Sequence, residues 1–399
     1  MRKKISVSEL RLGMFIDKLD GNWLQHPFWK TSFKLDNPKN ITALKESAVT
    51  HLWIDTSKGL DVEDKQPSKA EAPPVQNDDK TTKEPVKAVP LEEEMMAAKE
   101  TLARAKQATM AMLQEARMGN SVSAKDVAPI VDEISQSIAR NSNAMLTVTR
   151  MKSKDDYTYL HSVAVCALMI ALGKQINYQG DFHSLGMAGL LHDVGKMAIP
   201  DEILNKPGKL TDEEFDIVKN HPFSGWEILK NSDDVDEIAL DVCLHHHERV
   251  DGNGYPDKLS GDKLSLVARM AAVCDVYDAI TSNRCYKAGW APADALKKMA
   301  EWKDGHFDEK IFQAFVKTVG IYPTGTLVKL KSNRLAVVVE QSHGTLLKPV
   351  IKIFYSCSHK AAIPNKVINL SASNEEIDCI EVTEDWGLEH KDLMDALGK

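Results

Sequence analysis

The sequence of 399 residues has few cysteines and lacks the patterns of a disulfide-stabilised or exported protein. Its six cysteines are scattered and include no CxxC pair. The amino-terminal stretch MRKKISVSEL begins with basic residues but meets serine and glutamate where a secretory signal would carry an apolar core. We therefore expect a cytoplasmic protein with reduced, mostly buried thiols and no disulfide framework.

Long apolar runs and an excess of basic residues are also missing. The longest apolar run, VAVCALMIALG at residues 163–173, is well short of the roughly 18 residues that a membrane-spanning helix needs. We therefore expect a core helix there and no membrane span. The formal net charge is -8, and no basic patch is visible in the linear sequence. This gives no reason to expect a nucleic-acid polymer as partner, although a local cationic pocket for a small phosphate is compatible with it.

The composition changes along the chain, which is long enough for two or three domains. Residues 1–58 contain the short apolar runs MFIDKL and HLWIDT, bounded by turn sequences, which predicts a small α/β or mainly β module. From residue 62 to residue 90 there are five prolines and no aromatic residue, leucine or isoleucine. We therefore expect residues 59–90 to form a flexible, disordered linker, either between two modules or within one.

Helix-forming sequence follows the linker. We expect residues 91–144 to form two connecting helices, the first ending before Gly119 and the second around residues 127–139. The methionine-rich face of the first helix either binds a partner or, more simply, packs against the second. Residues 145–320 read as helical, and residues 321–399 as strands with tight turns followed by a short exposed helix. The predicted fold class is mainly α: a helical bundle with a small amino-terminal α/β domain and a small carboxy-terminal β appendage.

The helical region carries histidines and aspartates that are spread over successive predicted helices. They occur one or two to a helix, tens of residues apart, which is how a helical bundle builds a metal site from inward-facing side chains. These candidate metal ligands are His161, His192, Asp193, His221, His246, His247 and Asp275.

Local sequence features favour metal binding by several of these residues. In LLHDVGK, residues 190–196, His192 and Asp193 are adjacent, and neighbours on a helix point in different directions. Both reach one cluster only if it lies near a helix end, and Gly195 supplies a stop there. Asp275 interrupts an otherwise apolar helix, where a lone carboxylate must be neutralised, paired or bound to a metal.

The surroundings of His221 and of the histidine pair add to this pattern. TDEE, residues 211–214, is a capping box that predicts a helix start at Thr211. We expect Pro222 to end that helix, which would leave His221 on its last turn. The GNGYP turn after the pair is expected to let both histidines reach inward.

Each residue alone has a simpler explanation. A single histidine on a helix is more often a satisfied core or surface group than a ligand, and a buried aspartate often pairs with arginine. The triple histidine at 245–247 can also form a solvated helix face. The seven residues in this order make those explanations the weaker ones, and we interpret His183, His245 and His306 as structural.

The motifs HDVGK, HPFSG, HHERVDGNGYP and DVYDAITSNRCYK resemble the signature series of the HD-GYP family of bacterial cyclic-dinucleotide phosphodiesterases. The resemblance covers about residues 145–319. The region before it, beginning SVSELRLGMFIDKLD, is similar to an uncharacterised domain often found ahead of HD-GYP domains. The resemblance implies an HD-type bundle that hydrolyses cyclic di-GMP to pGpG, ending a second-messenger signal, and it leaves open whether pGpG is cleaved further to GMP. Cyclic GMP-AMP is the alternative substrate.

The resemblance also implies a role for each matching residue. Asp193, next to His192, bridges two divalent ions, and Lys196 contacts the scissile phosphate. The other ligands divide between the two ions: His161 and Asp275 with one, and His221, His246 and His247 with the other. Further substrate contacts are assigned to Arg284, Lys287 and the loop of Gly254, Tyr255 and Pro256.

We expect two metal ions, and we expect them to be iron or manganese. Histidine and carboxylate ligands without thiolates suit these ions, although cobalt, nickel and zinc also fit, and the behaviour of the family favours iron or manganese. Some members of the family bind a third metal through a glutamate four residues before the first histidine. Tyr157 stands at that position here. Two such ions activate a shared water for in-line attack on phosphorus.

Two functions other than cyclic-dinucleotide hydrolysis are also compatible with parts of the sequence. One is a receptor or interaction hub that binds cyclic dinucleotides without hydrolysis, which the near-complete ligand set disfavours. The other is a phosphohydrolase of ordinary nucleotides, which the GYP segment disfavours. A second copy of the chain and signalling proteins such as diguanylate cyclases are further candidate partners. Residues 1–140 carry no recognisable sensor or catalytic motif.

Overall fold

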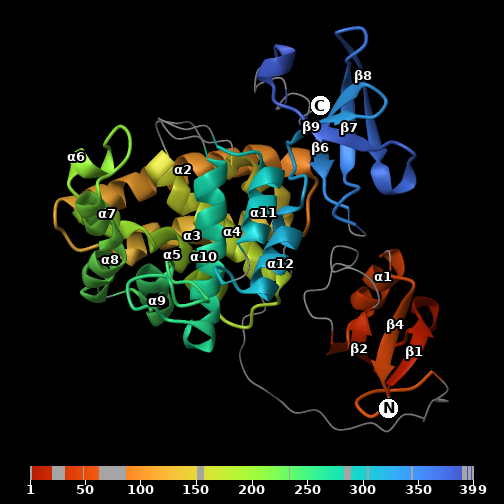
Figure 1. The fold of residues 1–399 in the computed structure, drawn as a ribbon, viewed down its shortest axis with the longest axis horizontal. Coiled ribbons are helices and arrows are strands. Elements are labelled where there is room, and N and C mark those ends of the chain that lie inside the picture. Colours follow the sequence, from red (N-terminus) through yellow and green to blue (C-terminus); the bar gives the residue numbers. More distant parts are fainter. Residues whose placement is uncertain are drawn as a thin grey trace. The chain divides into compact units, whose positions relative to one another are not determined.

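The computed structural model describes residues 2–19, 32–47, 49–62, 87–150, 157–232, 234–282, 289–302, 305–342 and 345–388, with Leu393 and Leu397. The chain divides into two compact units, residues 1–87 with 342–346 and residues 88–341 with 347–399. Helices dominate the second unit, and each unit contains one small sheet (Figure 1). The predicted fold class is therefore confirmed. Most of the predicted linker, residues 63–86, lies outside the described residues.

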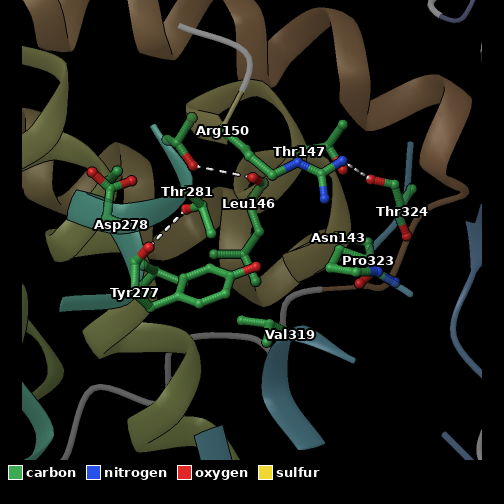
Figure 2. A pocket seen from close by; sticks show the side chains of 13 residues that line it. Asn143, Leu146, Thr147, Arg150, Tyr277, Asp278, Thr281, Val319, Pro323 and Thr324 are labelled. Atoms are coloured by element: carbon green, nitrogen blue, oxygen red, sulfur yellow. Dashed lines mark hydrogen bonds between the residues drawn. The ribbon is translucent and has the colours of Figure 1, made fainter. Parts of the chain in front are cut away.

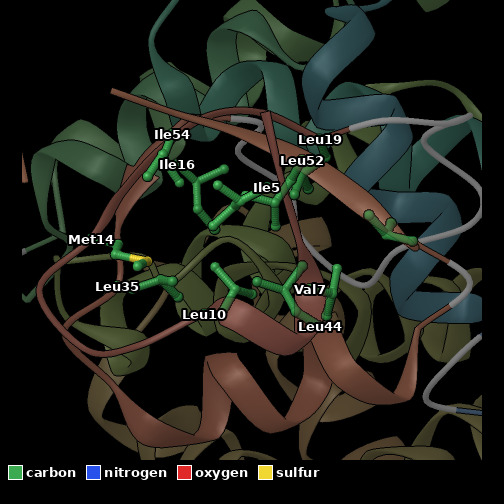
Figure 3. Close-up of a cluster of buried hydrophobic side chains, with 11 residues drawn as sticks. Ile5, Val7, Leu10, Met14, Ile16, Leu19, Leu35, Leu44, Leu52 and Ile54 are labelled. Carbon is green, nitrogen blue, oxygen red and sulfur yellow. The ribbon is translucent and has the colours of Figure 1, made fainter. Parts of the chain in front are cut away.

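The first unit is an antiparallel sheet with one helix, α1 (Pro38–Glu46). The strand order is β1-β4-β2-β3, with β1 (Arg2–Ser6), β2 (Phe15–Leu19), β3 (Phe33–Lys34) and β4 (His51–Asp55), and a 3₁₀ turn η1 (Val7–Glu9) follows β1. In β4, Leu52 and Ile54 are buried while His51 and Trp53 are exposed, as the two-residue period of a strand requires. Figure 3 shows these buried chains meeting residues of α1 and η1 in one apolar core.

The second unit begins with a helical hairpin. In it, α2 (Leu91–Arg117) packs against α3 (Ala124–Arg150), as expected for the methionine-rich face of α2. Glu94 near the start of α2 contacts Arg140, and Arg104 contacts Glu133, so the two helices run antiparallel. A break at Asn141 interrupts α3, which explains why the sequence pattern appeared to stop near residue 139.

The centre of the bundle is α4 (Tyr157–Gln175), which packs against helices on several sides. Its neighbours are α2, α3, α5 (Phe182–Leu191), α10 (Leu266–Thr281) and α12 (Glu309–Val319). Every residue from 163 to 173 is buried, so the expected core helix is confirmed. No described helix is long and apolar enough to cross a membrane.

Shorter elements complete the bundle. They are η4 (Val194–Ala198), α6 (Asp201–Leu204), α7 (Asp212–Lys219), α8 (His221–Lys230), α9 (Glu237–His245), η5 (Gly261–Lys263) and α11 (Pro292–Glu301). The capping box at Thr211 is present at the start of α7. The expectation for Pro222 is wrong: α7 ends before it, and Pro222 lies in the first turn of α8, where its missing N–H is not needed. His221 therefore begins α8.

The carboxy-terminal sheet is antiparallel, with strand order β8-β7-β6-β5-β9. Its strands are β5 (Leu327–Leu330), β6 (Arg334–Glu340), β7 (Val350–Ser356), β8 (Ala361–Asn369) and β9 (Ile377–Ile380), with 3₁₀ turns η6 (Leu370–Ala372) and η7 (Glu384–Trp386). The tight turns predicted here are present, with Asn333 at φ 57° between β5 and β6. Leu393 and Leu397 are buried against Phe354 and its neighbours, so these two residues of the predicted exposed helix are not exposed.

The described cysteines are all free thiols, as expected. Cys166, Cys243 and Cys274 are buried in the helical bundle, and Cys379 is exposed. Burial raises the pKa of Cys166, which keeps this thiol protonated.

Candidate metal centre

The seven candidate ligands meet at one place in the bundle, although they come from five regions of the chain. The contributing segments are α4, the end of α5, the start of α8, the end of α9 and the middle of α10. All of the ligands except His247 are buried. Six of them form two groups in which every ligand atom lies within 4.8 Å of the others: His161, His192 and Asp193 in one, and His221, His246 and His247 in the other. Asp275, the seventh, lies beside both groups.

Asp193 belongs to the first group and also faces the histidines of the second. Its Oδ2 atom is 3.4 Å from Nε2 of His161 and 3.3 Å from Nε2 of His192. Its Oδ1 atom is 3.3 Å from Nε2 of His221 and 3.7 Å from Nε2 of His246. The two oxygens thus face different sets of imidazoles, which is the geometry that a bridging carboxylate needs.

Asp275, on α10, also faces histidines of both groups. Its Oδ1 atom is 3.0 Å from Nε2 of His161, and its Oδ2 atom is 3.7 Å from Nδ1 of His247. The sequence resemblance placed Asp275 with one ion only. In the structure its carboxylate reaches toward histidines of both groups.

The hydrogen bonds behind the imidazoles fix which ring nitrogen faces the centre. Nδ1 of His192 lies 2.8 Å from the carbonyl of Gly189, and Nδ1 of His221 lies 2.7 Å from the carbonyl of Val218. Because a carbonyl only accepts, Nδ1 must carry the proton and Nε2 must present its lone pair inward. Nδ1 of His246 is held in the same way, 3.0 Å from the carbonyl of Cys243.

This arrangement fits a bound cation. Nε2 of His221 and Nε2 of His246 lie 3.3 Å apart, and neither carries a proton to share if each Nδ1 donates to its carbonyl. Nε2 of His192 and Oδ1 of Asp193 are buried without a hydrogen-bond partner. Buried lone pairs that converge without donors are costly, and a divalent ion accepts them as ligands.

The ionisation states suit metal binding. Burial lowers the pKa of His246 well below its ordinary value and that of His247 to about 3, so both rings are neutral. Burial opposes the ionisation of Asp193, but the charge of Lys196 and contacts with His192 hold its pKa well below the ordinary value. Neutral imidazoles and ionised carboxylates are the forms that bind metals.

The helix α5 ends at Leu191, so His192 and Asp193 follow a helix end as predicted.

Two glycines near the ligands allow backbone segments to pack closely. A Cβ atom on Gly195 would lie 1.9 Å from the carbonyl oxygen of His221, so glycine is needed where η4 packs against α8. A Cβ atom on Gly254 would similarly lie 2.4 Å from the backbone of Arg249.

Lys196 and the loop of Gly254, Tyr255 and Pro256 border the ligands. Nζ of Lys196 lies 2.5 Å from Oδ2 of Asp193, and its side chain is 24% exposed, so it remains accessible from solvent. The Tyr255 ring lies 4.8 Å from that of His247. Burial and the nearby carboxylates raise the pKa of Tyr255, so its hydroxyl stays protonated as a donor. Arg284, Lys287 and the Tyr157 side chain lie outside the described parts.

Asp278 and Glu248 also lie around the ligands, although neither residue was predicted to. Oδ2 of Asp278 lies 2.7 Å from Nδ1 of His161 and orients that ring, as the carbonyls orient the others. Its position three residues after Asp275, on the same helix face, was the available signal. Glu248 is buried and accepts the backbone N–H of Asp257, which ties the residues after the histidine pair to the loop.

The histidines interpreted as structural each contact groups outside the two ligand sets. His183 pairs with Asp132, and His245 lies 2.8 Å from Asp241. His306 stacks on Phe307 with ring centroids 4.2 Å apart.

Comparison with known proteins assigns the chain to a family. The model of the HD domain matches residues 131–311, which contain all seven candidate ligands, and that of a domain of unknown function, DUF3391, matches residues 2–127. A Pseudomonas aeruginosa protein named Cyclic di-GMP phosphodiesterase PA4108 is 50% identical over 399 residues, covering 99% of this chain and 95% of its own. The chain belongs to the HD-GYP family of phosphodiesterases.

Other relatives of this HD-GYP protein match over shorter stretches. The Vibrio cholerae protein named 3'3'-cGAMP-specific phosphodiesterase 2 is 40% identical over 131 residues, which are 33% of this chain and 25% of that protein. Among solved structures, the HDG"Y"P protein Bd1817 from Bdellovibrio bacteriovorus matches at 18% identity with a TM-score of 0.47, covering 79% of this chain and 98% of that one.

Proposed function

We propose that this HD-GYP protein hydrolyses cyclic di-GMP to pGpG at a centre of two divalent metal ions. The observation that carries the proposal is the position of Asp193, whose two oxygens face different groups of imidazoles at 3.3–3.7 Å. The relative that matches nearly the whole chain is named for cyclic di-GMP, which supports this substrate. The second-messenger signal would end with the opening of the ring.

The ligand set supports the choice of metal. The two groups offer imidazole nitrogens and carboxylate oxygens and no thiolate, which suits iron or manganese. When bound, two such ions acidify a water and neutralise the charge of the phosphate. In this proposal His161, His192 and Asp275 would hold one ion and His221, His246 and His247 the other, and Asp193 would be shared by both.

The remaining residues act on the substrate. Lys196 is directed to the centre by its contact with Asp193, and on substrate binding its ammonium group stabilises the charge that grows on the non-bridging phosphate oxygens. Tyr255 presents a protonated hydroxyl from the loop beside His247. We assign the second phosphate to Arg284 and Lys287 from the motif alone.

Cyclic GMP-AMP is the second candidate substrate, favoured by the similarity to the Vibrio cholerae protein named for it. The proposed phosphate contacts do not read bases, so the same centre would serve either ring. The alternative to an enzyme is a receptor that binds cyclic dinucleotides without hydrolysing them.

Product analysis separates these possibilities. Protein loaded anaerobically with iron or manganese is incubated with each cyclic dinucleotide, and the nucleotides are resolved by chromatography. We expect pGpG from cyclic di-GMP, with GMP formed later if the linear product is also cleaved. Faster cleavage of cyclic GMP-AMP would transfer the assignment to that substrate. Tight binding without any product, in protein shown to contain metal, would support the receptor.

A further inference from the structure

The carboxy-terminal end of α2 contacts the chain just beyond Lys196. Arg117 is the last residue of α2, and its Nη1 donates to the carbonyl of Ile199 at 2.7 Å. Its Nη2 lies 3.0 Å from Oδ1 of Asp201, the first residue of α6. One planar guanidinium thus holds two points of the segment that follows η4. Arg117 is neither a candidate ligand nor part of the proposed mechanism.

Backbone hydrogen bonds link Ile199 to Lys196 and to a metal ligand. The N–H of Ile199 donates to the carbonyl of Lys196 at 3.1 Å, and the N–H of Lys196 donates to the carbonyl of Asp193 at 3.0 Å. Arg117 therefore holds one end of a short series of hydrogen bonds that leads to Asp193. A displacement of Ile199 would move the backbone from which the lysine side chain extends.

The 3₁₀ helix η4 depends on its neighbours for a fixed position. It has five residues, and the hydrogen bonds of a 3₁₀ helix have poorer geometry than those of an α-helix. It packs against both α8 and α2. On α8 the close approach of Gly195 to His221 leaves no room for a side chain. On α2 the polar contact is that of Arg117.

The proposed role of Lys196 requires a well-placed backbone. Its Nζ lies 2.5 Å from Oδ2 of Asp193, and the side chain is 24% exposed. A lysine carries its charge on a flexible four-carbon stem. Stabilisation of a transition state depends on a charge that is already in place, so a small shift of the backbone reduces it.

The contact also joins two regions that match different families. Arg117 lies within residues 2–127, which match DUF3391, and Lys196 lies within residues 131–311, which match the HD domain. Both residues belong to the second compact unit. The region ahead of the HD domain thus contributes a contact beside the candidate metal centre.

We propose that Arg117 is a positioning residue for Lys196, acting through the carbonyl of Ile199 and η4. The inference rests on the proposed function, because its kinetic effect passes through the role given to Lys196. Loss of the guanidinium should leave the metal in place, since its contacts lie beyond Lys196 in the chain.

Arg150 offers a matched control. It is the last residue of α3, and its Nη2 donates to the carbonyl of Thr324 at 2.6 Å, as Figure 2 shows. Like Arg117, it ties the end of a long helix to a backbone carbonyl. The segment that it holds lies between α12 and β5 and carries no candidate site residue.

Kinetics of the full-length, metal-loaded protein on cyclic di-GMP test the proposal. We expect Arg117→Gln to lower kcat about tenfold, with KM and metal content changed by less than about twofold. In a Lys196→Ala background the same substitution should change kcat by less than about twofold, because its effect passes through the lysine. Arg150→Gln should leave kcat within about twofold. Equal losses in both backgrounds, or full kcat in Arg117→Gln, would overturn the proposal.

Hydrogen exchange tests the positioning without substrate. We expect the amides of residues 194–201 to exchange faster in Arg117→Gln, and at the unmodified rate in Arg150→Gln. Arg117→Lys, which keeps the charge but lacks the planar fork, should give a smaller increase. Faster exchange in protein that cleaves neither cyclic dinucleotide would support the contact and count against the proposed function alone. Unchanged exchange of residues 194–201 would overturn the proposal.

Discussion

Substitution of Lys196 can show whether a loss of turnover occurs without a loss of metal. It contacts Asp193 but belongs to neither ligand group. We predict that Lys196→Ala keeps its metal and lowers kcat about 10²–10³-fold, because a charge that stabilises the transition state is removed. Metal content and steady-state kinetics, measured on the same preparation, check this. A variant that turns over at the full rate would remove Lys196 from the mechanism.

Asp278 tests the orientation of a single ligand. We predict that Asp278→Ala weakens metal binding about 10–100-fold, because the His161 ring loses the carboxylate that holds it. Ser282→Ala is the matched control, since it removes a hydroxyl that donates to the same carboxylate and leaves the contact with His161. Competition with a chelator gives both affinities. Equal affinities for the two variants would show that Asp278 does not position the ligand.

His306 gives a pH dependence that is independent of the ligands. Burial, with a smaller effect of Arg249, lowers the pKa of this histidine to about 4. The folded protein therefore binds this proton less well than the unfolded chain, whose histidine has a pKa near 6.5, and stability falls as pH drops through this interval. We predict that His306→Gln loses less stability than the unmodified protein between pH 7 and pH 5. Parallel losses in thermal unfolding would contradict the assignment.

The types of the site residues could be predicted from the sequence, but several of their partners could not. Asp193 and His192 stood out because adjacent ionisable residues follow an apolar helix. Asp278 did not, because its partner His161 is 117 residues away and only the packing of α4 on α10 brings them together. The divided contacts of Asp275 were missed for the same reason: a sequence gives no distances between helices.

At the scale of elements, the α2–α3 hairpin is held by a buried charged contact. Glu94 is 2% exposed and accepts two bonds from Arg140, at 2.6 and 2.8 Å, and one from Ser137. We predict that Glu94→Ala lowers the free energy of unfolding by about 2–4 kcal/mol, because the partners lose their acceptor while largely buried. Urea denaturation measures the change.

The matched control uses the exposed ion pair on the same hairpin. Glu133 pairs with Arg104, and both side chains are well exposed. Glu133→Ala should therefore cost about 0–1 kcal/mol. If the two variants lost the same stability, the buried contact would not be what fixes α2 on α3.

Element types were easier to predict than element ends. The apolar run in α4 was correctly predicted to be a core helix, because it is apolar on every face and every face is buried. Pro222 was misassigned, since a proline both ends one helix and starts the next, and α7 and α8 are almost continuous around it. The strand β8 is difficult to predict as a separate element, because most of its residues are exposed and its sequence, AAIPNKVIN, lacks a clear alternation.

At the scale of the whole molecule, the metal centre follows from the order of helices around α4. Ligands separated by more than a hundred residues meet because α5 and α10 pack against that one buried helix and α8 and α9 pack in turn on α5 and its extension η4. The first unit has its own sheet and core and contributes no candidate ligand among its described residues. The proline-rich stretch that follows residue 62 lies near the end of this unit, and the domain bounds expected from composition stay a prediction.

The measurement that tests the central claim most directly is anomalous diffraction from crystals of the iron- or manganese-loaded protein, at the absorption edge of the metal. We predict two peaks, one on each side of the Asp193 carboxylate, each close to the imidazole nitrogens of its own group. Asp193→Ala crystals treated in the same way should lack both. A single peak away from Asp193, or none in protein with its fold intact, would contradict the account.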